Sequence, residues 1–295
     1  MTRRRIPHVV TCSTILFILV GCCVSCFAAD VLIIADAQLK PVIEFTQGLR
    51  KTLRASTRTY SPAEVKGHLA AVLQREEARV VITMGREALN EALTLPPSVP
   101  VIYDMVVTPP AINRPNTVGY YMATLASEYA SFVRAHLPSL KSVAAVASRD
   151  YLNTLVTEAA APVSSHSVKN TVEFVSTVKK LDTTDAILLL PDSAIMTTAA
   201  MEEAYLHSFR RRIPLLGISE RHVKEGALLA LVVDMVNVGK MIGEQAAKAL
   251  KSGSVGQSPA SPPGKFELYL NMDTARKMHI NIPDNVVRMA RKAYP

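Results

Sequence analysis

The sequence has no Trp, and all 4 of its Cys lie within the first 26 of its 295 residues. Beyond Cys26 this absence excludes a disulfide framework, a thiolate zinc cluster and a cysteine nucleophile. Beyond residue 30 there is also no apolar run near the ~18 residues that a membrane-spanning helix needs. The rest of the chain has an ordinary globular composition, with 49% hydrophobic and 20% charged residues, and its length suggests two domains or one large α/β unit.

A strong excess of positive charge is also missing once the amino terminus is set aside. The formal net charge is +8, but Arg3, Arg4 and Arg5 supply three of these charges and no acidic residue precedes Asp30. The other 30 basic residues face 25 acidic ones, which leaves a net charge of +5. Nucleic-acid-binding surfaces usually show clustered basic residues and a larger excess, so we expect no nucleic-acid partner.

The amino terminus has the anatomy of a secretory signal peptide. Three arginines precede an apolar stretch, Val9 to Gly21, and Cys26-Phe27-Ala28 forms a small-x-small cleavage signal. Residues 1–29 are therefore predicted to be a signal peptide, and the protein to be periplasmic or otherwise extracytoplasmic. Leu19-Val20-Gly21-Cys22 also fits a lipobox, in which case Cys22 would carry a lipid anchor. Both modes of processing stay open.

Short apolar runs alternate with amphipathic stretches along the remaining chain. The runs are rich in Val, Ile and Leu, and such runs are typical of strands buried on both faces. They span residues 31–35, 80–83, 99–103, 143–147, 186–190, 215–218 and 228–233. The alternation predicts βαβ units and parallel sheets with helices on both faces. Because the runs divide near Asn116 to Tyr121, the pattern predicts an α/β fold of two doubly wound lobes with a cleft between them.

Polar residues follow nearly all of these runs, at the carboxyl ends of the strands, where open α/β sheets bind ligands. Acidic residues there suit a ligand ammonium group, Thr83, Gly85 and Ser148 could present helix N–H groups to a carboxylate, and tyrosines could stack on an apolar body. This combination favours an amino acid or a small amine. The candidate substrate-binding residues are Asp36, Thr83, Met84, Gly85, Tyr103, Asp104, Tyr121, Ser148, Asp192, Ser193, Ser219 and Asp234.

Each candidate also has a purely structural interpretation. An Asp or Ser between a strand and a helix is often only the helix N-cap, Asp234 could only fix a hinge, and Met84 could simply pack. Of the adjacent Tyr120 and Tyr121, at most one is expected to face the ligand. The sequence leaves open which of these residues touch ligand.

The motifs of common enzyme classes are missing. No strand is followed by G-x-G-x-x-G, there is no G-K-[ST] P-loop, and Gly217-Ile218-Ser219 lacks the last glycine of G-x-S-x-G. The 7 His are scattered, with no pair at metal-ligand spacing. We therefore expect no catalytic residue, no metal site and no cofactor.

Several segments of the second half match a known pattern: Asp185 to Asp192 (DAILLLPD), Arg212 to Gly217 (RIPLLG), Glu225 to Ala230 (EGALLA) with Asp234 and Gly239, and, most specifically, Leu268 to Asn271 (LYLN) with Ala275 to Pro283 (ARKMHINIP). In these segments the chain resembles the ABC transporter substrate-binding proteins, a family with tryptophan- and tyrosine-binding members. The resemblance implies a type I periplasmic binding protein fold, closure of two lobes on a small ligand, delivery to a membrane permease and no catalysis.

The resemblance also implies three crossings between the lobes, near Tyr120, Asp234 and Lys265. It places one lobe at residues 30–120 plus 235–264 and the other at 121–234 plus 265–295. One departure is Val107-Thr108-Pro109-Pro110, since the family usually carries Asp-Pro in this loop. Ligand identity therefore does not transfer.

These observations predict the extracytoplasmic solute-binding component of an ABC transporter, closing around a small organic ligand such as an amino acid. The expected partners are the ligand and a membrane permease, and the protein is expected to be a monomer. The alternative is a periplasmic ligand-sensing protein that presents its ligand to a membrane receptor.

Overall fold

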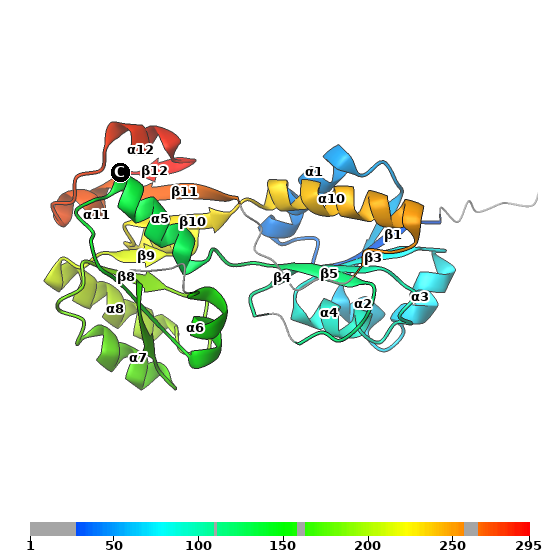
Figure 1. Ribbon diagram of the computed structural model, residues 1–295, viewed down its shortest axis with the longest axis horizontal. Coiled ribbons are helices and arrows are strands. Elements are labelled where there is room, and N and C mark those ends of the chain that lie inside the picture. Colours follow the sequence, from blue (N-terminus) through cyan, green and yellow to red (C-terminus); the bar gives the residue numbers. More distant parts are fainter. Residues whose placement is uncertain (1–27, 109–110, 158–162, 257–264) are drawn as a thin grey trace, which may run out of the picture.

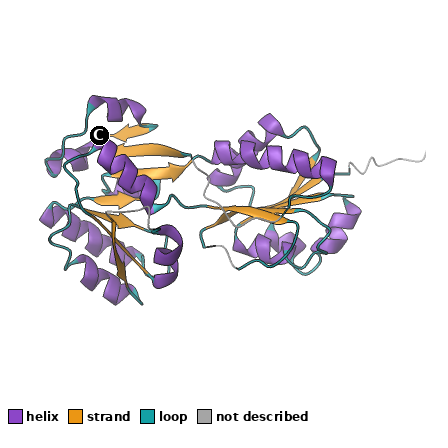
Figure 2. Ribbon diagram, viewed as in Figure 1, coloured by secondary structure: helices purple, strands orange, loops and turns teal. Residues whose placement is uncertain are grey.

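The computed structural model describes residues 28–108, 111–157, 163–256 and 265–295 (Figure 1). The predicted lipid-bearing Cys22, and all of the predicted signal peptide except Ala28 and Ala29, lie outside these residues. The described chain forms two lobes side by side, each built on its own sheet with helices on both faces (Figure 2). The predicted fold class, two doubly wound α/β lobes, is confirmed.

The first lobe is built on a five-stranded, wholly parallel sheet of order β2-β1-β3-β4-β5. Its strands are β1 (Val31–Ile34), β2 (Thr57–Tyr60), β3 (Val80–Met84), β4 (Val101–Val106) and β5 (Thr117–Tyr121). One face is covered by α1 (Lys40–Thr52) and α10 (Met235–Ser252). The other is covered by α2 (Pro62–Val65), α3 (Leu69–Arg75) and α4 (Arg86–Ala92).

The second lobe is built on a seven-stranded sheet of order β12-β11-β10-β9-β8-β6-β7. Its strands are β6 (Val143–Ala147), β7 (Val163–Ser167), β8 (Ala186–Leu189), β9 (Leu215–Gly217), β10 (Leu229–Val233), β11 (Phe266–Asn271) and β12 (Lys292–Tyr294). Its helices are α5 (Ala126–His136), α6 (Arg149–Leu155), α7 (Thr171–Val178), α8 (Thr198–Arg211), α9 (Glu220–Glu225), α11 (Met272–Lys277) and α12 (Asp284–Met289). The sheet is parallel except that β11 runs antiparallel to β10, which the sequence did not predict.

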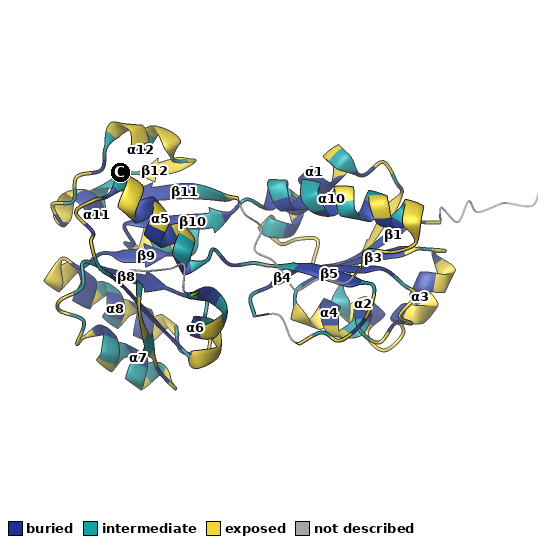
Figure 3. Ribbon diagram, viewed as in Figure 1, coloured by how far each residue is buried: buried dark blue, intermediate teal, exposed yellow. Residues whose placement is uncertain are grey.

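The seven predicted apolar runs all form strands, and these strands are the buried interior of the two sheets (Figure 3). β2, β5, β7, β11 and β12 were not among them. Four of these five are sheet edges, where one side of the strand faces solvent; β2 (TRTY) and β7 (VSSHS) carry mostly exposed, polar side chains. Such strands have no continuous apolar run, so the sequence pattern does not predict them.

Helix α10 follows β10 of the seven-stranded sheet but packs against α1 on the five-stranded sheet. Two glycines permit this close packing. A Cβ on Gly239 would lie 2.0 Å from the carbonyl oxygen of Phe45, and one on Gly48 would lie 2.0 Å from that of Val236. Helix α10 emerges from the second lobe, and its close packing on α1 anchors it to the first lobe.

Hydrogen bonds tie together the segments that pass between the sheets. The Thr124 hydroxyl, between β5 and α5, donates to the carbonyl of Leu231 in β10 at 2.8 Å. The N–H of Asp234, between β10 and α10, donates to the carbonyl of Lys265 at 3.2 Å. The passages thus lie next to one another, while the residue boundaries predicted for the two lobes stay a prediction.

Candidate functional site

The carboxyl edges of the two sheets are turned toward the junction between the lobes (Figure 1). The chain leaves the first sheet at the end of β5 and leaves the second at the end of β10, in both cases to enter the other lobe. Strands parallel to β5 or β10 end at the same edge as they do. The candidate residues of both lobes therefore lie at edges that border the junction.

Asp104, near the end of β4, is the most unusual group at these edges. Only 2% of the residue is exposed, and its Oδ2 has no hydrogen-bond partner among the described residues. Burial raises the pKa of this carboxyl to about 7, against a smaller lowering by a hydrogen bond from the Met105 backbone. Buried polar atoms are nearly always paired in native proteins, so this carboxylate oxygen is the strongest candidate at these edges for a ligand contact.

A β-bulge sets the position of Asp104. Between Tyr103 and Val106 the strand holds one residue more than the facing stretch of β5, and Met105 has a φ of 57°, in the left-handed region that a non-glycine residue seldom adopts. Bulges re-aim side chains and concentrate near functional sites. The chain thus tolerates local strain at the residue that follows this carboxylate.

Next to Asp104 lie the candidates of β3. The Thr83 hydroxyl is fully buried and lacks a hydrogen-bond partner within the described chain. The N–H of Gly85, at φ 93°, donates to the Asp104 carbonyl at 2.9 Å and is therefore not free for a ligand. Met84 pairs with Asp104 across the sheet and packs into the core under α1 and α10, as its structural interpretation anticipated.

Two tyrosines border this region. The ring of Tyr103 lies against Gly119 of β5, where a Cβ would come within 2.2 Å of the ring. The pKa of the Tyr120 phenol is raised, first by burial and then by the negative charges of Asp104 and Glu244, so Tyr120 lies near the Asp104 carboxylate. Tyr121 ends β5 at the same edge. Tyr103 is buried in a cluster with Leu89 and Val106, whereas Tyr120 packs on the core under α1 and α10 near Asp104.

The candidates of the second lobe mainly hold backbone. Oδ2 of Asp192, a buried residue, accepts a hydrogen bond from the Ser148 N–H at 2.9 Å and so links the loops after β8 and β6. The Ser219 hydroxyl caps α9 and the Asp234 carboxylate caps α10. Ser193 is exposed, and the Ser148 hydroxyl makes no capping bond to α6.

Asp36 of the first lobe is similar, because it is exposed and its carboxylate accepts from the N–H of Gln38 at 3.1 Å. The sequence left open whether Ser219 and Asp234 only cap a helix, and in the structure both side chains do cap the helix that follows them. Whether any of these residues also touches ligand stays a prediction.

An ion pair that the sequence did not reveal connects the lobes. Nζ of Lys40, the first residue of α1, lies 3.2 Å from Oε2 of Glu220, the first residue of α9. Hydrogen bonds from Tyr294, Lys40 and Lys224 lower the pKa of the Glu220 carboxyl to about 2. No sequence spacing marks this pair, because the partners are separated by 180 residues.

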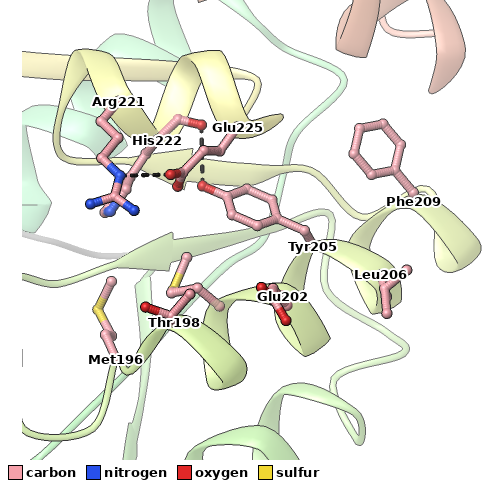
Figure 4. Close-up of a pocket in the computed structure, with 10 residues that line it drawn as sticks. Met196, Thr198, Glu202, Tyr205, Leu206, Phe209, Arg221, His222 and Glu225 are labelled. Atoms are coloured by element: carbon pink, nitrogen blue, oxygen red, sulfur yellow. Dashed lines mark hydrogen bonds and ion pairs between the residues drawn. The ribbon is translucent and has the colours of Figure 1, made fainter.

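A cavity of about 600 Å³ lies within the second lobe between α8 and α9 (Figure 4). Along α8 the apolar side chains of Met201, Leu206 and Phe209 line the cavity together with the polar Thr198 and Glu202. Along α9 its wall is polar, and Arg221 pairs there with Glu225 at 2.6 Å. The Tyr205 hydroxyl crosses between the helices and donates to the His222 carbonyl at 3.1 Å. None of the candidate residues lines this cavity.

Neither a metal site nor a membrane span emerges from the described part of the chain. There, no group of three or more His, Cys, Asp or Glu is arranged to hold a metal ion. No helix within the same residues has the length and hydropathy needed to cross a membrane.

Comparison with known proteins points to one family. The sequence pattern of the ABC transporter substrate binding proteins matches residues 110–294, which is more than half of the chain. No curated protein is significantly similar in sequence.

Solved structures share the two-lobed fold at low sequence identity. One is an ABC domain in complex with L-Trp from Streptococcus pneumonia, with a TM-score of 0.56 and 19% identity over 89% of this chain and 99% of that one. A second is a ligand-free, open substrate-binding protein with adhesive properties from Clostridium difficile, with a TM-score of 0.66 and 13% identity over 90% and 98%. A third, a conserved domain protein from Vibrio cholerae, has a TM-score of 0.58 and 16% identity over 90% and 99%.

Proposed function

We propose, from the premise that this chain belongs to the ABC transporter substrate-binding protein family, that it captures a small aminated organic solute between its two lobes and delivers it to a membrane permease. An amino acid is the ligand class that we favour. One observation carries the proposal: the buried carboxylate of Asp104, with an oxygen that no described group satisfies, at a sheet edge that borders the junction.

The chemistry of Asp104 suits an ammonium group. An ionised carboxylate buried without a partner is costly, and a ligand cation would relieve that cost through a short, charge-assisted hydrogen bond. The aromatic ring of Tyr120, whose phenol lies near this carboxylate, offers surface for an apolar or aromatic body. The L-Trp bound to the streptococcal structure of the same fold supports an amino acid as the ligand.

The transport cycle that we propose uses the two lobes as a hinge. Ligand bound at the first lobe would be covered by closure of the second, and the closed form would be the one that a permease recognises. The protein would act outside the cytoplasm as a monomer, without chemical conversion of its ligand. Export would depend on residues 1–29, with lipidation at Cys22 as the alternative to simple cleavage.

Calorimetric titration and thermal unfolding of the exported protein test the ligand class. The probes are amino acids, amines without a carboxylate, and carboxylates without an amine. A ligand at about 100 times its Kd should stabilise the protein by about 2.7 kcal/mol. We expect stabilisation by aminated probes and none by carboxylates alone; no response to any probe would contradict solute binding.

The Asp104→Asn variant tests the site itself. Removing one member of a buried charge pair costs about 2 kcal/mol or more, so the affinity for aminated ligands should fall about 30-fold or more. Asp185→Asn is the matched control, because Asp185 precedes β8 at the opposite edge of the second sheet and binds only the segment at Lys141 and Ser142. Equal affinities of Asp104→Asn and wild type would show that the pocket lies elsewhere.

A further inference from the structure

The Lys40–Glu220 ion pair, called the cross-lobe pair below, joins elements that belong to different sheets. Lys40 opens α1, which connects β1 to β2 in the five-stranded sheet. Glu220 opens α9, which connects β9 to β10 in the seven-stranded sheet. Any rotation that separates these two helix ends must stretch the 3.2 Å contact between Nζ and Oε2.

The acidic partner is held in place by its own lobe. The Tyr294 hydroxyl, from β12, donates to Oε1 of Glu220, and Nζ of Lys224 lies 3.4 Å from the same oxygen. The Glu220 side chain is 23% exposed, whereas that of Lys40 is 67% exposed. The acceptor is thus held by its own lobe, while the exposed Lys40, which also lies 3.9 Å from Glu44 on α1, reaches it from the other lobe.

The pair lies where it can influence the hinge. The charge of Glu44, one turn after Lys40 on α1, contributes to the pKa shifts of Glu267 in β11 and Arg291 beside β12, so this end of α1 lies near the outer strands of the second lobe. The other side of α1 packs on α10, which follows directly from β10. The helix therefore lies between the cross-lobe pair and one of the passages that connect the sheets.

We infer that the cross-lobe pair is a latch that holds the two lobes close to the angle at which they bind ligand, and thereby tunes ligand affinity. This inference rests on the proposed function, in which the lobes close on a ligand. A latched hinge samples fewer arrangements before binding, so less conformational entropy is lost when the lobes close. Breaking the latch should weaken ligand binding without removing any group that touches ligand.

Lys40→Met tests the latch, and Lys224→Met is its matched control. Both variants remove a lysine from the same carboxylate, but only Lys40 reaches Glu220 from the other lobe. Spin labels at Asn90→Cys on α4 and Ser176→Cys on α7 report the distance between lobes in the protein expressed from Asp30 onward, because both sites are exposed and this part of the chain has no cysteine of its own.

We expect Lys40→Met to broaden the distance distribution and to weaken binding of the best aminated probe about two- to five-fold, as for an exposed ion pair. Lys224→Met should leave both readouts near wild type, and Lys40→Arg should restore them. Salt at 1 M should make the wild type resemble Lys40→Met, because it screens the pair.

Two results separate the latch from the proposed function. If wild type binds an aminated probe but Lys40→Met has the wild-type distance distribution and affinity, the latch is overturned and solute binding stands. If no probe binds but Lys40→Met still broadens the distribution, the cross-lobe pair does set the lobe angle, while its effect on ligand affinity and the proposed function are both overturned.

Discussion

Two acids at the edges of the two lobes show how differently one fold can treat a carboxylate. Asp104 of the first lobe is buried, its Oδ2 has no hydrogen-bond partner within the described chain, and its pKa is raised to about 7. Glu220 of the second lobe is partly exposed, bound by three donors, and its pKa is lowered to about 2. A satisfied acid stabilises the structure that surrounds it, whereas an unsatisfied one is retained at a cost. The first lobe therefore carries a buried acid with one oxygen unpartnered among the described residues, and the second carries an acid whose partners include a lysine of the first lobe.

The largest expected effect comes from disrupting the α1–α10 interface, which holds the two lobes together. Gly239→Ala would place a Cβ 2.0 Å from the Phe45 backbone, and neither helix backbone can yield without parting α1 from α10. We expect the free energy of unfolding to fall by about 3 kcal/mol, measured by denaturant unfolding.

Gly243→Ala, one turn further along α10, is the control. There the nearest atom to a new Cβ is the hydroxyl oxygen of the Thr52 side chain, at 2.2 Å, and a side chain can rotate away. The loss should be clearly smaller than for Gly239→Ala. Equal losses would mean that the backbone contact does not limit the α1–α10 interface.

The stability of the protein should depend on pH through Asp104. Because the pKa of Asp104 is raised from 3.8 to about 7, the folded, ligand-free protein keeps a proton that the unfolded chain loses across that range. This part of the stability is thus full below about pH 4 and falls as pH rises toward 7. Tyr120, whose pKa Asp104 and Glu244 both raise, stays neutral throughout the window.

Asp104→Asn should remove this fall, so that at pH 8 the variant is more stable than wild type by about 2 kcal/mol in denaturant unfolding. Asp192→Ala is the opposite case, because it leaves the Ser148 N–H without its acceptor and should destabilise the protein by about 1 to 3 kcal/mol. An Asp104→Asn variant less stable than wild type at pH 8 would show that the carboxylate is satisfied in solution.

The sequence predicted the frame of the fold because the inner strands are apolar on both faces. Runs such as Val80 to Thr83 and Ala186 to Leu190 can only be stable inside a covered parallel sheet. The sequence missed strands such as β2, because these are held in the sheet by backbone pairing with a neighbouring strand and not by burial of their own side chains. The antiparallel direction of β11 depends on how the chain returns from α10, which no local pattern encodes.

The site was predictable to the level of strand ends and no further. Position after a buried strand identified both Asp104 and Asp192. Only the fold shows that Oδ2 of Asp104 has no hydrogen-bond partner among the described residues, while Oδ2 of Asp192 binds the Ser148 backbone. Glu220 follows the same strand-end segment as Ser219, yet its partners come from α1 and from β12 at the end of the chain. Contacts between such distant segments exist only after the lobes have assembled.

The smallest expected effect concerns the support of Glu220. Tyr294→Phe removes the hydroxyl that contributes most to lowering the pKa of Glu220. We expect that pKa, followed by carboxyl carbon NMR, to move up toward 4.5, with a loss of unfolding free energy below about 1 kcal/mol at pH 7. A lowered pKa gives stability that is complete above about pH 4.5 and is lost as pH falls toward 2, so the variant should lose less stability in acid than wild type.

Lys292→Met is the control for this titration. It removes a cation stacked on the Tyr294 ring without touching Glu220, so it should leave the titration of Glu220 unchanged. A pKa of Glu220 already near 4.5 in wild type would show that its three donors do not stabilise the ionised carboxylate.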